Sequence, residues 1–190
     1  MTQQISRAMA KFEKRVIVGT FTNAAAQELI GRNSLVPKGL IGTLHSHANR
    51  ALSAHMPVAD TMIDEWNGAN PDLKLSGGKV AEEDNAAGVR GGKTDGDFAY
   101  ATLQILRNRM LSRELWPRIE GGAEALNFER RWNQFKRNAG AIDFTDMVEM
   151  ALRDTSEHPA KPDIMFWDEF QDFTPLEIAL VEKWGNAAPH

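Results

Sequence analysis

The first fifty residues alternate between helical and strand-like spacing of their apolar positions. Residues 2–14 place apolar side chains every three or four positions among basic ones, which predicts an amphipathic helix. Residues 15–22 (RVIVGTFT) are rich in small and β-branched side chains and predict a buried strand. A helix is expected over 24–31 and a second short strand over 40–45. This order of elements is typical of a parallel α/β sheet.

The middle of the chain has a different pattern. Residues 53–98 are rich in Gly, Asn, Asp and Ala, which favours a linker-like loop inside an insertion. Helical spacing returns over 100–110, over 123–138 and over 144–153. In the second of these helices, the aromatic side chains share one face and basic side chains surround them. The sequence therefore predicts a helical insertion between two parts of a sheet domain.

The last segment combines a strand with acidic residues. Residues 162–167 (PDIMFW) predict an apolar strand, and Asp168 and Glu169 follow it directly. Pro175 suits the first turn of a closing helix, which is expected to end near Gly185. An acid pair after such a strand lies at the carboxyl edge of a parallel sheet, where α/β folds bind ligands.

Composition narrows the classes of protein. The chain has 190 residues, of which 42% are hydrophobic and 25% are charged, so it suits one domain or one domain with a large insertion. The net charge of -4 argues against a wholly basic nucleic-acid coat, although it leaves room for a local basic groove. The absence of cysteine excludes disulfides and thiolate zinc sites. No apolar run suits a signal peptide or a membrane span, so a cytoplasmic protein is expected.

The acid pair has two readings. In a nucleotide-hydrolysing motor the first acid, Asp168, would hold Mg²⁺ through water, and the second, Glu169, would act as general base on the attacking water. Alternatively, the pair is a solvated acidic turn. The sequence around it, DEFQD followed by Thr-Pro-Leu, resembles the Walker B motif of the UvrD/PcrA/Rep DNA helicases. The resemblance implies that Gln171 couples nucleotide state to the rest of the motor.

Two upstream segments resemble DNA-contact motifs of the same family. Thr20-Phe21-Thr22-Asn23 before an Ala-rich helix is similar to the first, in which the ring, here Phe21, contacts a base of the single strand. A ring at a strand end is a sequence-tolerant stacking platform, and a helix N-terminus offers amides to a phosphate. Asn23 is expected to cap that helix. Taken alone, Phe21 is better explained as a side chain of the core.

Gly42-Thr43-Leu44-His45-Ser46 resembles the second DNA-contact motif. Thr43, His45 and Ser46 are expected to donate hydrogen bonds to phosphates or sugars. A rival interpretation is that His45 and His47 bind a metal, since alternation would place both on one face of a strand, but no third ligand is evident.

Residues 142–146 (IDFTD) resemble the DFxD-L segment that precedes Walker B in the family. Their acids are expected to cap a helix and to position the inserted helical subdomain. The four motifs occur in the family order over residues 20–176. Because LHSH, ELWP and DFTD occur together, the phage-type relatives are favoured.

The phosphate-binding loop of the family is expected before the first DNA-contact motif, and no GxxxxGK[ST] precedes it here. A substitute at 88–94 (GVRGGKT) is rejected because its first glycine is one residue too close and because it falls inside the insertion. In addition, no strand precedes it and no clear helix is expected to follow. A split gene, a mis-called start or an incomplete assembly would each explain the absence.

The resemblance implies an α/β fold with an incomplete RecA-like (P-loop NTPase) parallel sheet and a helical insertion. Residues 1–50 and 141–190 would form the RecA-like part, and 51–140 the insertion. The expected function is part of an ATP-dependent helicase motor that translocates on single-stranded DNA and unwinds duplexes. The expected catalytic, metal-binding, coupling and DNA-binding residues are Glu169, Asp168, Gln171, Phe21, Thr22, Asn23, Thr43, His45 and Ser46.

The expected partners are single-stranded DNA or a DNA junction, and a separate chain that supplies missing motor parts; no membrane is expected. ATP and Mg²⁺ belong to the complete motor, and the isolated chain is expected to bind them poorly and to be inactive. Two alternatives stay open. The chain could be a non-catalytic single-stranded DNA-binding or interaction module derived from a helicase, or a generic α/β domain whose motifs arose by chance.

Overall fold

The computed structural model describes residues 15–31, 35–52, 54–76 and 93–188. They belong to two compact units. The sheet unit comprises residues 1–53, 148–173 and 177–190, and the helical unit comprises 54–147 and 174–176. The helix expected over 2–14 lies outside the described residues, as do 77–92 of the expected loop.

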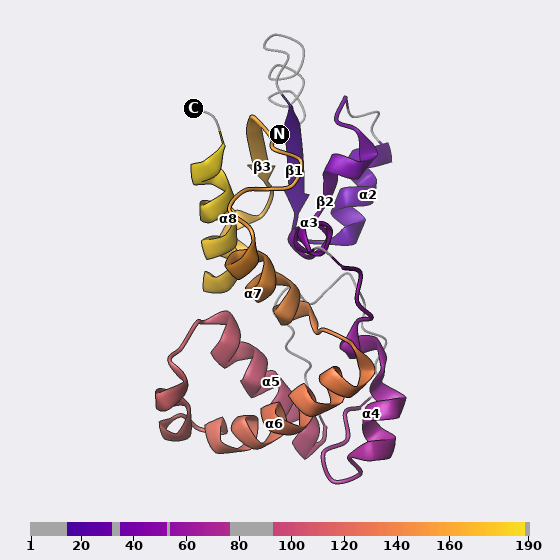
Figure 1. The fold of residues 1–190 in the computed structure, drawn as a ribbon, viewed down its shortest axis with the longest axis vertical. Coiled ribbons are helices and arrows are strands. Elements are labelled where there is room, and N and C mark those ends of the chain that lie inside the picture. Colours follow the sequence, from indigo (N-terminus) through magenta and orange to yellow (C-terminus); the bar gives the residue numbers. More distant parts are fainter. Residues whose placement is uncertain (1–14, 32–34, 53, 77–92, 189–190) are drawn as a thin grey trace. The chain divides into compact units, whose positions relative to one another are not determined.

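The sheet unit contains a three-stranded parallel sheet. Its strands are β1 (Val16–Thr20), β2 (Ile41–Thr43) and β3 (Ile164–Trp167), in the order β2-β1-β3. Both neighbours pair with β1 in parallel, and Figure 1 shows β1 between them. The predicted α/β class and parallel sheet are confirmed, with each strand shorter than its apolar run.

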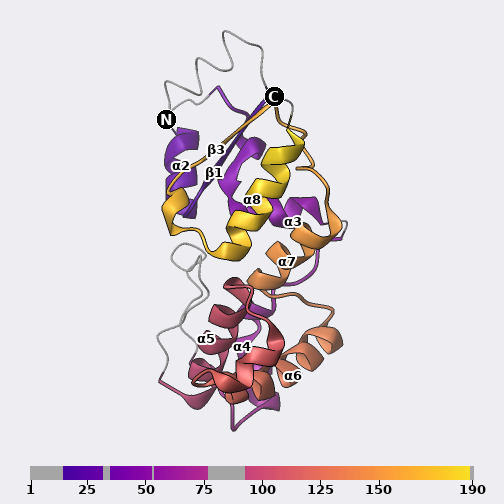
Figure 2. The same ribbon diagram turned by 90° about the vertical axis from the view of Figure 1, so that its left-hand side faces the viewer.

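Helices cover both faces of this sheet. Val16 and Val18 of β1 pack in one cluster with Ala26 of α2 (Asn23–Gly31), against Ile164 and Phe166 of β3. Because strand side chains alternate, the intervening residues face the other way. Figure 2 shows α8 (Pro175–Ala187) on the opposite side of the sheet from α2. The closing helix was therefore predicted from Pro175, and it runs two residues past Gly185.

Two expectations about the connecting segments were wrong. The second strand ends at Thr43 rather than at residue 45, because a helix, α3 (Leu44–Ala51), starts there. The region expected as loop over 53–98 contains α4 (Ile63–Ala69) and the first turn of α5 (Asp95–Asn108). Both of these helices have acidic residues in the first turn, a start signal that the Gly- and Asn-rich composition masked.

The helical unit is built around aromatic side chains. Besides α4 and α5 it contains the 3₁₀ segment η3 (Arg113–Arg118) and α6 (Gly122–Ala139). Trp66, Phe128 and Trp132 are fully buried, with ring centroids 4.9 to 5.8 Å apart. Phe135 stacks on Trp132 at 5.4 Å. The shared aromatic face predicted for 123–138 is confirmed.

The DFTD segment caps α7 (Phe144–Asp154), which starts in the helical unit and ends in the sheet unit. The Asp146 N–H donates to Asp143 Oδ1 at 2.7 Å, and the Asp143 N–H donates to Asp146 Oδ2 at 2.9 Å. Each acid therefore satisfies an amide at the start of the helix, as a reciprocal capping box does. The predicted capping role is confirmed.

Asp143 also joins α7 to the other helices of the helical unit. Its carboxylate is completely buried and lies 2.9 Å from Arg107 of α5 and 2.7 Å from Lys136 of α6. The Trp132 indole N–H donates to it at 2.9 Å. Although burial opposes the charge, the two cations and the hydrogen bonds hold the pKa of Asp143 well below its ordinary value. One carboxylate thus fixes three helices.

We predict that Asp143→Asn destabilises the helical unit by about 3–5 kcal/mol, because it removes the fully buried one of the two carboxylates that Arg107 and Lys136 share and leaves them only the less buried Asp146. Urea unfolding followed by circular dichroism measures the change. Asp72→Asn is the matched control, since its ion pair with Arg131 is exposed and should contribute little. Equal midpoints for the two variants would contradict the importance of the Asp143 cluster.

Candidate functional site

The carboxyl ends of the three strands bring the sequence motifs to one edge of the sheet. Thr20 of β1 pairs with Thr43 of β2, and Gly19 of β1 pairs with Trp167 of β3. The Asp168 N–H donates to the Gly19 carbonyl at 2.9 Å, which extends the pairing by one residue. The segments that follow the strands therefore start at the same edge, the usual ligand edge of α/β sheets.

The first strand end turns directly into α2. Thr22, rather than the expected Asn23, caps the helix, because its Oγ1 accepts the Ala25 N–H at 3.1 Å. By accepting, the hydroxyl keeps its own hydrogen for another acceptor. Phe21, in the bend before the helix, is half-buried, so part of its ring is accessible at this edge.

The second strand end turns into α3 in the same way. Thr43 Oγ1 accepts the Ser46 N–H at 3.2 Å, and Ser46 Oγ donates to the Thr43 carbonyl at 2.8 Å. This local capping competes with the strand and ends it at Thr43. The hydroxyl hydrogen of Ser46 is thus used inside the turn, which leaves the oxygen as an acceptor and not the group as the expected donor.

The two histidines of α3 have different surroundings. His47 is fully buried; its Nε2 lies 3.2 Å from the Val18 carbonyl, and its Nδ1 lies 3.1 Å from Nε2 of His158. The Ala160 N–H donates to His158 Nδ1 at 3.1 Å. These contacts are mutually consistent when both rings are neutral and each carries its proton on Nε2.

Burial lowers the pKa of His47 to about 4 and that of His158 to about 3, so both are neutral at pH 7. Both ring nitrogens of His47 are occupied, and a helix does not place residues 45 and 47 on one face. The metal interpretation of these histidines was therefore wrong. Burial also lowers the pKa of His45 to about 4, so this ring is neutral at pH 7 as well.

The carboxylates follow β3 in a tight turn. Asp168 is half-buried, and Glu169 and Gln171 are exposed, with the Gln171 amide donating to the Glu169 carboxylate. Glu169 has φ of 54°, a left-handed conformation that costs a non-glycine residue about 1–2 kcal/mol. Such strain concentrates at functional sites, where it fixes the direction of a side chain. Here it occurs at the residue after Asp168, so both acids belong to the turn that follows β3.

Gly19, Trp167 and Phe173, which were not singled out from the sequence, organise the packing at this edge. The Trp167 ring lies directly against Gly19, where a Cβ atom would come within 1.9 Å of the ring. From there Trp167 contacts His47 at 5.8 Å and Phe173 at 5.9 Å between ring centroids. The only sequence signal was a glycine in the middle of a strand, which often marks a close approach.

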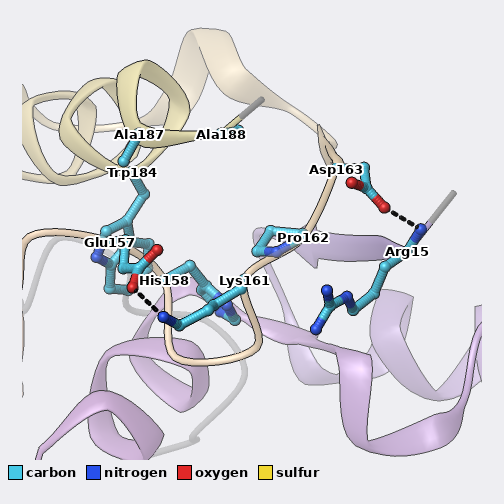
Figure 3. Close-up of a pocket in the computed structure, with 9 residues that line it drawn as sticks. All are labelled: Arg15, Glu157, His158, Lys161, Pro162, Asp163, Trp184, Ala187 and Ala188. Atoms are coloured by element: carbon cyan, nitrogen blue, oxygen red, sulfur yellow. Dashed lines mark hydrogen bonds and ion pairs between the residues drawn. The ribbon is translucent and has the colours of Figure 1, made fainter. Parts of the chain in front are cut away.

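One cavity of about 310 Å³ opens elsewhere in the sheet unit (Figure 3). It lies beside Arg15 and Asp163, which precede β1 and β3 and hydrogen-bond at 2.7 Å. The cavity is therefore at the amino edge, opposite the strand ends described above. Its Lys161 pairs with Glu157 at 2.7 Å, so its charges satisfy one another.

The segment that ends in Lys93-Thr94 does precede a helix, contrary to expectation. Thr94 caps α5 and accepts the Asp97 N–H at 3.1 Å. The Lys93 and Thr94 amides both donate to the carboxylate of the buried Asp97, at 3.0 and 3.1 Å. The Asp97 carboxylate thus occupies the place that a phosphate takes in a phosphate-binding loop. The segment is therefore not available as a phosphate-binding loop. Residues 88–92 lie outside the described part.

Within the described ranges, no group of three or more His, Asp or Glu side chains is arranged to hold a metal ion. The Asp168 carboxylate has the chemistry that a hydrated Mg²⁺ prefers, since Mg²⁺ takes carboxylate oxygen and keeps several waters. In the same part of the chain, no helix combines the length and the apolar character needed to cross a membrane.

Comparison with known proteins gives one match. The family model of the UvrD/REP helicase N-terminal domain matches residues 1–188. No curated protein and no solved structure matches the chain. The matched region includes both DNA-contact motifs, the DFTD segment and the acid pair.

We predict that Gly19→Ala destabilises the sheet unit by about 1–3 kcal/mol, because the methyl group overlaps the Trp167 ring. Gly39→Ala is the control, since an added Cβ there meets nothing within 4 Å. Thermal unfolding of both variants measures the difference. A second substitution, Trp167→Leu, should cost less in the Gly19→Ala background than in the unchanged chain. Additive costs would contradict the close approach.

We also predict that stability falls as pH is lowered from about 6.5 to 5. The unfolded chain takes up protons on histidine near pH 6.5, whereas the folded chain resists protonation of His47 and His158 until far lower pH. The unfolded state therefore binds more protons in this window, and its population rises. Urea midpoints against pH test this. His47→Gln should make the profile less steep without abolishing it, because burial also lowers the pKa of His45 and His158; substitution of the exposed His55 should not have this effect. A flat profile for the unchanged chain would contradict neutral, buried rings.

Proposed function

The chain belongs to the UvrD/REP helicase N-terminal domain family, and from this premise we propose that it forms the strand- and nucleotide-facing edge of an ATP-driven DNA helicase motor. The parallel register of β1, β2 and β3 is the observation that carries the proposal. It brings the ends of the two DNA-contact motifs and the acid pair to one sheet edge. In the complete motor, this edge translocates on single-stranded DNA and drives unwinding.

The proposed contact with single-stranded DNA, called the strand contact below, consists of an aromatic ring and neutral polar groups. Phe21 stacks on a base, and the helix N-termini of α2 and α3 direct their amides towards phosphates. Thr22, Thr43 and His45 donate hydrogen bonds to the sugar-phosphate backbone of the DNA. Asn23, next to Thr22 in the chain, belongs to the same contact. Ser46 accepts, for example from a base N–H, because its own hydroxyl hydrogen bonds the Thr43 carbonyl.

The nucleotide side is carried by the turn after β3. Asp168 would hold Mg²⁺ through water, and the ion would supply charge neutralisation on the phosphates of ATP. Glu169 orients the attacking water and takes its proton. The left-handed backbone at Glu169 and the hydrogen bond from Gln171 fix the starting direction of this carboxylate. Gln171 is thus placed to respond when the nucleotide changes.

The organisation of the chain fits separate roles in DNA contact and in nucleotide binding. We assign residues 1–50 and 141–190 to the RecA-like part and 51–140 to the helical insertion. The Asp143 cluster, which fastens α7 to α5 and α6, supports the view that the DFTD segment positions the insertion. The insertion is proposed to act on the DNA junction ahead of the single strand.

The rival is a non-catalytic single-stranded DNA-binding module. Both candidates share the strand contact and differ in whether Asp168 and Glu169 take part in hydrolysis. The 190 residues contain no GxxxxGK[ST]. In the most similar segment, residues 88–94, the Lys93 and Thr94 amides already donate to the Asp97 carboxylate. We therefore expect this chain to need motor parts supplied by another chain or segment before the acids can function.

We predict that the chain binds a fluorescein-labelled oligothymidylate and that Phe21→Ala weakens binding by about 5-fold or more, since one stacked base contributes about 1–3 kcal/mol. Fluorescence anisotropy at low and moderate salt measures the affinity, which should fall as salt rises. Phe98→Ala is the control, because Phe98 is an exposed phenylalanine of the helical unit that belongs to neither DNA-contact motif.

A folded chain that does not bind the oligonucleotide would exclude the DNA-contact assignments. Release of phosphate from MgATP is followed in the same samples, with Glu169→Gln beside the unchanged chain. We expect no turnover by either. Turnover that disappears in Glu169→Gln would show that the isolated chain is a complete enough motor and that the phosphate-binding loop has been misjudged.

A further inference from the structure

Phe173 is a buried ring at the point where the carboxylate turn rejoins the body of the sheet unit. It contacts three other rings. Its centroid lies 5.9 Å from Trp167 at the end of β3, 5.5 Å from Phe170 within the turn, and 6.5 Å from Phe21 at the end of β1. The Phe21 contact is the most nearly parallel of the three, with 28° between the ring planes.

The backbone ties Phe173 to the acid pair. The Asp172 N–H donates to the Glu169 carbonyl at 2.9 Å, and the Phe173 N–H donates to the Phe170 carbonyl at 3.2 Å. These two turns run in succession from Glu169 to Phe173. A displacement of Phe173 that shifts its backbone therefore moves the segment that carries the Glu169 carbonyl, unless one of the two hydrogen bonds breaks.

Phe21, in contrast, has little local restraint. It lies in the bend between β1 and α2, outside the paired residues of the sheet, and its ring is half-buried. A ring held in one orientation loses less conformational freedom on stacking than one that must first be ordered. The face of Phe173 supplies such a restraint from the side of the carboxylate turn.

We propose that Phe173 is a positioning residue that holds Phe21 ready for stacking and links the strand contact to the turn carrying Asp168 and Glu169. The inference rests on the proposed function of this edge. A DNA base that stacks on Phe21 acts on one ring of the Phe21–Phe173 pair, and a movement of the turn that carries Asp168 and Glu169 acts on the other. Coupling of this kind is reciprocal, so nucleotide state and strand occupancy each bias the other.

A double-mutant cycle tests the proposal. The unchanged chain, Phe21→Ala, Phe173→Leu and the double variant are titrated with an oligothymidylate that carries one 2-aminopurine, whose fluorescence reports stacking. Leucine keeps most of the apolar volume at 173 while removing the ring, which favours a folded variant. Leu180→Ala controls for general loosening, because Leu180 is fully buried in α8 of the same unit. Circular dichroism shows whether each variant is folded.

We expect Phe173→Leu to weaken binding by about 3-fold or more in the unchanged chain and by less than 1.5-fold in the Phe21→Ala background, estimates that follow from the stacking magnitude. Leu180→Ala should leave affinity unchanged. Equal effects of Phe173→Leu in both backgrounds, or none in either, would overturn the inference while leaving the proposed function intact. Absence of binding by the unchanged chain would overturn the proposed function, and this inference with it.

Discussion

The sheet unit depends on the missing side chain at Gly19. Because β1 carries no Cβ atom at this position, the Trp167 ring can lie directly against the strand, closer than any other residue type would allow. β1 is the central strand, so the ring is anchored at the middle of the sheet. Because this ring is large and rigid, its position determines how His47 and Phe173 pack against it.

From Trp167, ring contacts extend in two directions. On one side they run through His47 and His158 to Trp184 of α8, with centroid distances of 5.8, 5.1 and 4.9 Å. On the other side they run through Phe173 to Phe21. The histidines can belong to this apolar series because burial keeps them uncharged and because each polar nitrogen has a partner. Packing in the interior thus leads without interruption to the proposed strand contact at the sheet edge.

The features that sequence predicted are those encoded by near neighbours. The apolar runs predicted the strands, their alternation with helices predicted parallel pairing, and the acids of DFTD predicted the cap of α7, which two hydrogen bonds confirm. His45 was misplaced because four residues, Thr43 to Ser46, form a cap that ends the strand early. Trp167 and Phe173 were not recognised, since their partners Gly19 and Phe21 lie about 150 residues away in the chain. Spacing along a sequence carries no record of such contacts.

The central claim is that the carboxyl edge of this sheet receives single-stranded DNA. Photo-crosslinking tests it most directly: an oligothymidylate is bound to the chain and irradiated, and the crosslinked peptides are identified by mass spectrometry. The account predicts crosslinks at Phe21 and within the peptide containing Thr43, His45 and Ser46, the two segments brought together by the β1–β2 register. Crosslinks confined to residues 54–147 of the helical unit, at saturating and salt-sensitive binding, would contradict it.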